Sequence, residues 1–369
     1  MVIYWATCLV SIGITLFLRR CIGGTSFLQR HKWISAIICA FPLMLLSSLR
    51  YGIGSDYESY EQIYRLIGAT MRNAHIYEPV FSYLIMFMNR LGLDFQWFIV
   101  FTSVVFLLLV YTVILEYSKS PCLSIYLLLA MTFFFQSTNI IRQMVACAIC
   151  LYSIQYIKER KLISFIVCVL LAFGFHTSGI LFLPAYFLYR KRFNIKFYII
   201  SIVTFFGAST LLSNYLRDII VQLGSRLNNG YYLTYFETRG SNFGIVSFLI
   251  NLLIFIWSSL FLDKTESFDQ DVISDRADYE NDMFLNFQFI TVILSILNGS
   301  FPLINRFRFY YALPGIMLIP RTLYSSKVNG NNRLVMEFFI VVLFFAYCVF
   351  IEGYMNQSAA IPYVSIFNK

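Results

Sequence analysis

The chain has 369 residues, of which 59% are hydrophobic and only 13% are charged, and its mean hydropathy is +0.70. In soluble domains about a quarter of the residues are charged, so this composition excludes a soluble protein with a single apolar core. The net charge of +9 does not indicate a nucleic-acid partner, because the Lys and Arg residues lie between apolar runs rather than in a basic stripe. The composition therefore predicts an integral membrane protein.

Apolar runs close to the roughly 20 residues of a spanning helix recur along the sequence. The first run has no basic residues before it and no small-residue cleavage site after it, so we expect a retained first span. The basic clusters are placed on the cytoplasmic side, which puts both termini outside. About 12 spans follow, at residues 2–18, 33–49, 95–117, 122–136, 140–157, 162–175, 180–189, 197–212, 243–262, 283–297, 309–319 and 334–351.

We therefore expect one transmembrane domain, residues 1–369, of all-α polytopic class. The apolar segment 78–92 has only about 15 residues and is too short to cross comfortably, so we expect an interfacial or re-entrant helix that opens at Pro79. It completes an outer region, residues 50–92. A second outer loop is expected at residues 213–242, and an acidic cytoplasmic loop at residues 263–282.

The first expected outer loop combines an arginine, acids and glycines. It reads RYGIGSDYESYEQIY from residue 50, and Gly52 and Gly54 allow a tight bend just before Asp56. The loop closes on Glu78. Asp56 and Glu78 can act as acid–base groups, and the alternative is that they are ordinary loop carboxylates.

Two further outer positions carry unusual polar residues. Residues 136–146 read QSTNIIRQMVA, and the spacing of Asn139, Arg142 and Gln143 predicts one shared helical face. An arginine in the first turn of a span is costly unless it is paired or hydrated. Residues 173–179, FGFHTSG, place His176 at an outer turn, where the alternative role is to cap a helix.

A late span carries the last group, in FPLINRFRFYY at residues 301–311. Arg306 and Arg308 lie at its outer end, and Asn305 precedes them. These arginines and Arg50 could simply reach lipid headgroups. Taken together, arginines, two acids and a histidine on one face outline a site that binds a polyanion beside a base.

These motifs resemble the EpsG family of bacterial polysaccharide polymerases, which are related in function to the Wzy O-antigen polymerases. The resemblance rests on RYGIGSDYESY with a following EPVF, on STNIIRQMVA, on FHTSGILFLPAYF and on RFRFYYALPGIMLIP, in the family's order from about residue 50 to 320. The sequence differs only slightly from the family's Gly-Gly-Thr-Asp or Gly-x-Asp forms in the first loop, because Gly54-Ser55-Asp56 keeps the glycine and the acid. After Glu78, Pro79-Val80 replaces a more usual Pro-Gly.

The resemblance implies a GT-C-like membrane glycosyltransferase in the bacterial cytoplasmic membrane, with its active site facing outward. It would move a growing glycan (O-antigen of lipopolysaccharide, capsule or exopolysaccharide) from undecaprenyl diphosphate to a sugar hydroxyl of a lipid-linked repeat unit. Its partners would be these lipid-linked oligosaccharides, membrane lipid and a chain-length regulator protein. No cofactor is expected, and no metal, because the outer face lacks a DxD-like motif and the eight Cys residues lack zinc or disulfide spacing.

The expected site residues fall into three roles. The diphosphate would be bound by the arginines Arg50, Arg142, Arg306 and Arg308. The general base would be Asp56, Glu78 or His176, with Asp56 slightly preferred. Other contacts to the substrate would come from Asn139, Gln143, Tyr57 and Asn305.

Three other functions compete. A flippase or transporter predicts polar residues through the membrane depth and on both faces. A glycan ligase, or another lipid-diphosphate glycosyltransferase, would share the diphosphate chemistry and differ in its acceptor. A scaffold of a polysaccharide assembly complex would tolerate substitution of Arg142 and His176.

Overall fold

The computed structural model describes residues 1–70, 76–227, 242–263, 275–298 and 304–368. Within these residues every regular element is a helix, and the single strand-like feature is an isolated bridge between Arg50 and Ser365. The expected all-α class is confirmed. The protein divides into two compact units, Met1–Leu183 with Val328–Lys369, and Pro184–Lys327.

The first unit is built around the long helix α6, which packs against α3 and α9. The unit contains α1 (Val2–Phe17), η1 (Leu18–Gly23), α2 (Gly24–Arg30), α3 (Lys32–Ser48), α4 (Tyr57–Thr70), α5 (Pro79–Arg90), α6 (Phe95–Tyr117), α7 (Pro121–Ala130), α8 (Phe133–Asn139), α9 (Ile141–Tyr152), α10 (Ile154–Lys158), α11 (Leu162–Phe175), η3 (Thr177–Phe182), α19 (Gly330–Cys348) and η4 (Val349–Tyr354).

The second unit is built around α16, which packs against α13, α15, α17 and α18. Its helices are α12 (Ala185–Leu188), α13 (Ile195–Leu227), α15 (Asn242–Phe261), α16 (Asp275–Asn298), α17 (Ile304–Ala312) and α18 (Gly315–Leu323). A buried ion pair between Arg321 and Glu280, 2.6 Å apart, ties α18 to α16. A buried charge of this kind is tolerated because its partner and further hydrogen bonds compensate it.

The membrane class is confirmed, but the count of about 12 spans is not. By length and composition, three helices of the described residues can cross a membrane, namely Val2–Cys21, Phe95–Tyr117 and Gly330–Tyr354. Helices α7 and α8 qualify as a fourth span when taken together, and they meet at a bend of 51°. The expected span 180–189 is instead the end of η3 and the short α12, and Pro314 separates α17 from α18 within the expected span 309–319.

The expected loops are partly helical. Helix α13 continues to Leu227 and α16 begins at Asp275, while residues 228–241 and 264–274 of the two predicted loops lie outside the described part of the protein. In the region 50–92 that the sequence predicts to lie outside, the described residues form α4 and α5. Helix α5 begins at Pro79, as expected, and its 12 residues extend only about 18 Å, too short for a bilayer core.

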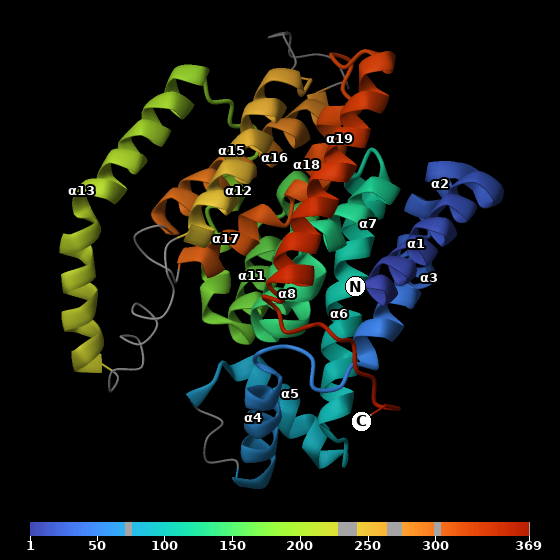
Figure 1. The fold of residues 1–369 in the computed structure, drawn as a ribbon, viewed down its shortest axis with the longest axis vertical. Coiled ribbons are helices and arrows are strands. Elements are labelled where there is room, and N and C mark those ends of the chain that lie inside the picture. The colour runs from blue at the N-terminus through green and yellow to red at the C-terminus, as the bar shows by residue number, and fades with distance from the viewer. Residues whose placement is uncertain (71–75, 228–241, 264–274, 299–303, 369) are drawn as a thin grey trace. The chain divides into compact units, whose positions relative to one another are not determined.

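Helix α4 shows why this region folds beside the first unit's core. Tyr57, Tyr60, Tyr64 and Ile67 recur at helical spacing and are buried, while Glu58 and Gln62 on the other side are exposed. The buried tyrosines pack against Phe95 and Phe98 of α6 and Phe81 of α5. This amphipathic pattern anchors α4 and α5 at one end of α6 (Figure 1).

Candidate functional site

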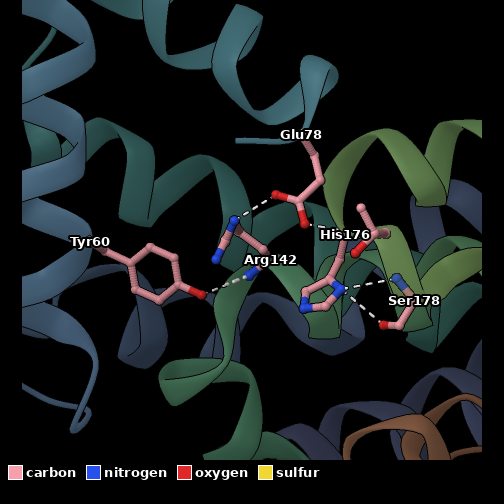
Figure 2. A network of polar contacts seen from close by, with 6 residues as sticks. Tyr60, Glu78, Arg142, His176 and Ser178 are labelled. Carbon is pink, nitrogen blue, oxygen red and sulfur yellow. Dashed lines mark hydrogen bonds and ion pairs between the residues drawn. The ribbon is translucent and has the colours of Figure 1, made fainter. Parts of the chain in front are cut away.

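The described structure of the first unit joins Arg142 and Glu78 in an ion pair. Nη1 of Arg142 lies 2.6 Å from Oε2 of Glu78, and the backbone N–H of Thr177 donates to Oε1 of the same carboxylate at 3.2 Å (Figure 2). The side chains are 22% and 10% exposed, so the pair is neither closed off nor fully hydrated. Two separate donors therefore hold both oxygens of one carboxylate.

Three breaks in helical structure produce this arrangement. Glu78 lies directly before Pro79, which starts α5; Arg142 is the second residue of α9, after the backbone leaves α8 at Ile140; and Thr177 follows the end of α11. Gly174 in α11 permits the close approach of α5, because a Cβ there would overlap the Cγ2 of Val80. A small residue at this position therefore lets the start of α5, and with it Glu78, lie beside the turn after α11.

Aromatic rings surround the guanidinium of Arg142. Its Cζ lies 5.0 Å from the ring centre of Phe81, 5.5 Å from that of Tyr77 and 5.9 Å from that of Tyr60. The Tyr60 hydroxyl also accepts a hydrogen bond from the backbone N–H of Arg142 at 3.4 Å. Rings at these distances attract a cation and exclude water, which strengthens the interaction of Arg142 with any anion.

His176 serves the turn after α11. Its Nδ1 lies 3.2 Å from the backbone N–H of Ser178 and 2.9 Å from the Ser178 hydroxyl. A backbone N–H can only donate, so the Nδ1 lone pair is the acceptor and the proton of a neutral ring is on Nε2. The alternative role of His176, a helix cap, is therefore present, and the ring is set as a donor rather than a base.

Asp56 is placed differently from the other two candidate bases. Its backbone N–H donates to Oδ1 of Asn139 at 3.2 Å, and the Ser55 hydroxyl donates to the same oxygen at 2.8 Å. Its carboxylate is half-buried and has neither a hydrogen bond nor an ion pair with the described residues. Its backbone carbonyl oxygen accepts from the N–H of Tyr60. Through Tyr60 the loop is connected to the Arg142 cluster, which consists of Tyr60, Tyr77, Glu78, Phe81, Arg142 and Thr177.

Several other predicted residues are not presented to a ligand. Arg50 is 2% exposed, and its Nη1 donates to Ser47 and Ser103. Tyr57 and Gln143 are buried. The expected common face of Asn139, Arg142 and Gln143 is wrong, because the helix is interrupted at Ile140. Asn139 instead accepts from the Asp56 loop.

The remaining predicted residues belong to the second unit. Arg306 and Arg308 lie on α17 and are half-exposed, while the side chain of Asn305 lies outside the described residues. Their binding roles stay predictions. No group of three or more His, Cys, Asp or Glu side chains within the described ranges could hold a metal ion.

Sequence reasoning missed Tyr60 and Thr177. The spacing of the tyrosines in α4 indicated a buried face, and Tyr60 lies in the middle of it. Thr177 contributes only its backbone N–H, so no side-chain pattern could have identified it.

The model of the EpsG family matches residues 33–365 of the protein. The chain belongs to the EpsG family. EpsG is a family of polysaccharide polymerases, and the matched range contains every residue of the Arg142 cluster and the Asp56 loop. Neither a curated protein nor a solved structure matches this EpsG-family protein.

Gly54 offers a test of the Asp56 loop. It has φ +110°, and a Cβ there would lie 2.7 Å from the backbone carbonyl oxygen of Thr138. Gly54→Ala should therefore lower the thermal midpoint of the purified protein and its polymer yield, by strain of about 1–3 kcal/mol plus the clash. Gly52→Ala is the matched control, because Gly52 also has positive φ but nothing within 4 Å of its Cβ position. Equal effects of the two substitutions would contradict the close packing of the loop on Thr138.

Proposed function

We propose that the protein is a Wzy-type polymerase of the outer face of the bacterial cytoplasmic membrane. It transfers a growing glycan from undecaprenyl diphosphate to a sugar hydroxyl of a new lipid-linked repeat unit. Membership of the EpsG family supports polymerase chemistry in general. The observation that carries the specific proposal is the partly exposed, aromatic-walled Arg142, which already holds a carboxylate.

The leaving group explains the need for arginine. Undecaprenyl diphosphate departs as an anion, so it needs stabilisation of developing charge more than it needs a proton. A guanidinium supplies this through several N–H donors in a fixed plane. Glu78 accepts from Nη1 alone, which leaves other donors of Arg142 for a diphosphate oxygen.

The acceptor explains the need for a carboxylate. The hydroxyl oxygen attacks the anomeric carbon of the donor, the bond from that carbon to the diphosphate oxygen breaks, and the diphosphate leaves with the electron pair. The hydroxyl proton passes to a base, which we assign to Asp56. Of the three candidates, its side chain is the one without a partner among the described residues.

Glu78 and His176 then take supporting roles. Glu78 orients Arg142 and joins it to the turn at Thr177. His176 caps that turn through Nδ1, and its Nε2–H can donate to a phosphate or sugar oxygen. As a base, His176 would have to give up the contacts of its Nδ1 with Ser178. Glu78 would act as a base while its two oxygens already accept from Arg142 and Thr177.

The diphosphate role of Arg142 is tested by substitution. Loss of one charged contact in a partly buried site costs about 2–5 kcal/mol, so Arg142→Ala should nearly abolish polymer. Arg142→Lys should restore it only in part, because an ammonium cannot bind two oxygens in one plane.

The control is Arg65→Ala in α4, whose side chain is 76% exposed and forms an ion pair with Glu61 one turn away. Exposed pairs contribute little, so this variant should make normal polymer. The proposal fails if Arg142→Ala, present in the membrane at the normal level, makes polymer of normal amount and length.

The base is tested by single-turnover transfer in Asp56→Asn, Glu78→Gln and His176→Gln, each with donor binding measured separately. Asp56→Asn should lose transfer by about 100-fold or more while donor binding persists. Glu78→Gln should weaken donor binding, because Arg142 loses its orienting anion. Glu58→Gln, an exposed acid in the first turn of α4, is the control and should transfer normally. Near-normal transfer by Asp56→Asn would remove Asp56 from the base role.

A further inference from the structure

The C-terminal segment (residues 355–368) lies along the backbone that leads from α3 to Asp56, and both belong to the first unit (Figure 1). The N–H of Ile366 donates to the C=O of Leu49 at 2.9 Å, and the N–H of Tyr51 donates to the C=O of Val364 at 3.0 Å. The N–H of Gly54 donates to the C=O of Ala359 at 3.2 Å. The segment therefore pairs with residues 49–54 through the backbone, over the whole approach to Asp56.

The C-terminal segment is itself held in one conformation. Oδ1 of Asn356 accepts from the N–H groups of Ala360 and Ile361 at 3.0 and 3.1 Å, and its Nδ2 donates to the C=O of Ile361 at 2.7 Å. The Tyr363 hydroxyl donates to the C=O of Leu46 at 2.9 Å. The Tyr4 hydroxyl donates to the C=O of Ala360 at 2.7 Å. These contacts fix the segment against α1 and α3 before it reaches the loop.

The C-terminal segment pairs with the backbone of Arg50, whose charged side chain is buried. Burial lowers the pKa of the Arg50 guanidinium to about 10, so the group still carries its charge at neutral pH. Its Nη1 is bonded to Ser47 and Ser103, while its Nε has no hydrogen-bond partner in the described structure. A buried charge is costly when it has no carboxylate partner, and Arg50 has none among the described residues. The charge of Arg50 is tolerated because the surrounding structure keeps the residue in place. The backbone bridge between Arg50 and Ser365 is part of that structure.

The other side of the same loop is held by the membrane helices. Nε2 of Gln96 in α6 donates to the C=O of Ser48 at 2.6 Å and to that of Arg50 at 3.3 Å. Oδ1 of Asn139 in α8 accepts a hydrogen bond from the backbone N–H of Asp56. The loop is thus fixed between helices on one side and the C-terminal segment on the other.

We infer that the C-terminal segment is a positioning element for Asp56 in glycan transfer, acting through backbone pairing with residues 49–54. This inference rests on the proposed function, because it takes Asp56 as the base. A base displaced by about 1 Å can lose about 100-fold in rate while the substrate still binds. The segment should therefore affect the rate of transfer at saturating substrate more than the affinity for the donor.

The test compares Ile366→Pro with Ile366→Ala in the purified full-length protein. Both lose the isoleucine side chain, and only proline removes the N–H that donates to Leu49. With lipid-linked repeat units as donor and acceptor, Ile366→Ala should match the wild type within about twofold. Ile366→Pro should lose about 10- to 100-fold in kcat, with an unchanged donor KM.

The outcomes separate the inference from the proposal beneath it. Equal kcat for the two variants, or a loss of donor affinity in parallel with the loss of kcat in Ile366→Pro, overturns the positioning role. Absence of transfer by the wild type overturns the proposed function itself.

If Ile366→Pro does not accumulate in the membrane, Tyr363→Phe decides. It removes only the hydroxyl that donates to Leu46 and should lower kcat several-fold without a change in donor KM. A wild-type kcat in Tyr363→Phe overturns the inference.

Discussion

The ion pair between Arg142 and Glu78 is the contact on which the candidate site depends. A guanidinium next to the rings of Tyr60, Tyr77 and Phe81 needs an anion, because a charge in such surroundings is costly without one. Glu78 supplies that anion and also accepts from Thr177. One carboxylate thereby joins three segments that lie far apart in sequence, which are the start of α5, the start of α9 and the turn after α11.

This contact also explains why irregular backbone collects here. Helices that cross a membrane satisfy their own backbone groups, so side chains for chemistry are best placed where helices end or break. The break between α8 and α9 provides both Asn139, which fixes the Asp56 loop, and Arg142, which binds Glu78. The same short stretch therefore sets the distance between Asp56, the proposed base, and Arg142, the residue proposed to bind the diphosphate.

The sequence was sufficient for the membrane class, the helical fold, the start of α5 at Pro79 and the family. It also singled out Glu78, Arg142 and His176, which lie at the start of α5, in the first turn of α9 and at the turn after α11, because polar residues in apolar surroundings stand out. It could not place Arg50, because a buried and an exposed arginine look alike in one sequence. The break at Ile140 was missed because no glycine or proline marks it. The pairing of the C-terminal segment was missed because backbone hydrogen bonds leave no side-chain pattern.

The central claim is that this EpsG-family protein extends a lipid-linked glycan by whole repeat units. The most direct measurement is to incubate the purified protein with purified undecaprenyl-diphosphate-linked repeat units and to separate the products by length. The account predicts a ladder of products that differ by one repeat unit, with undecaprenyl diphosphate released at each addition. A single addition that stops, or no product from an intact and correctly folded protein, would contradict it.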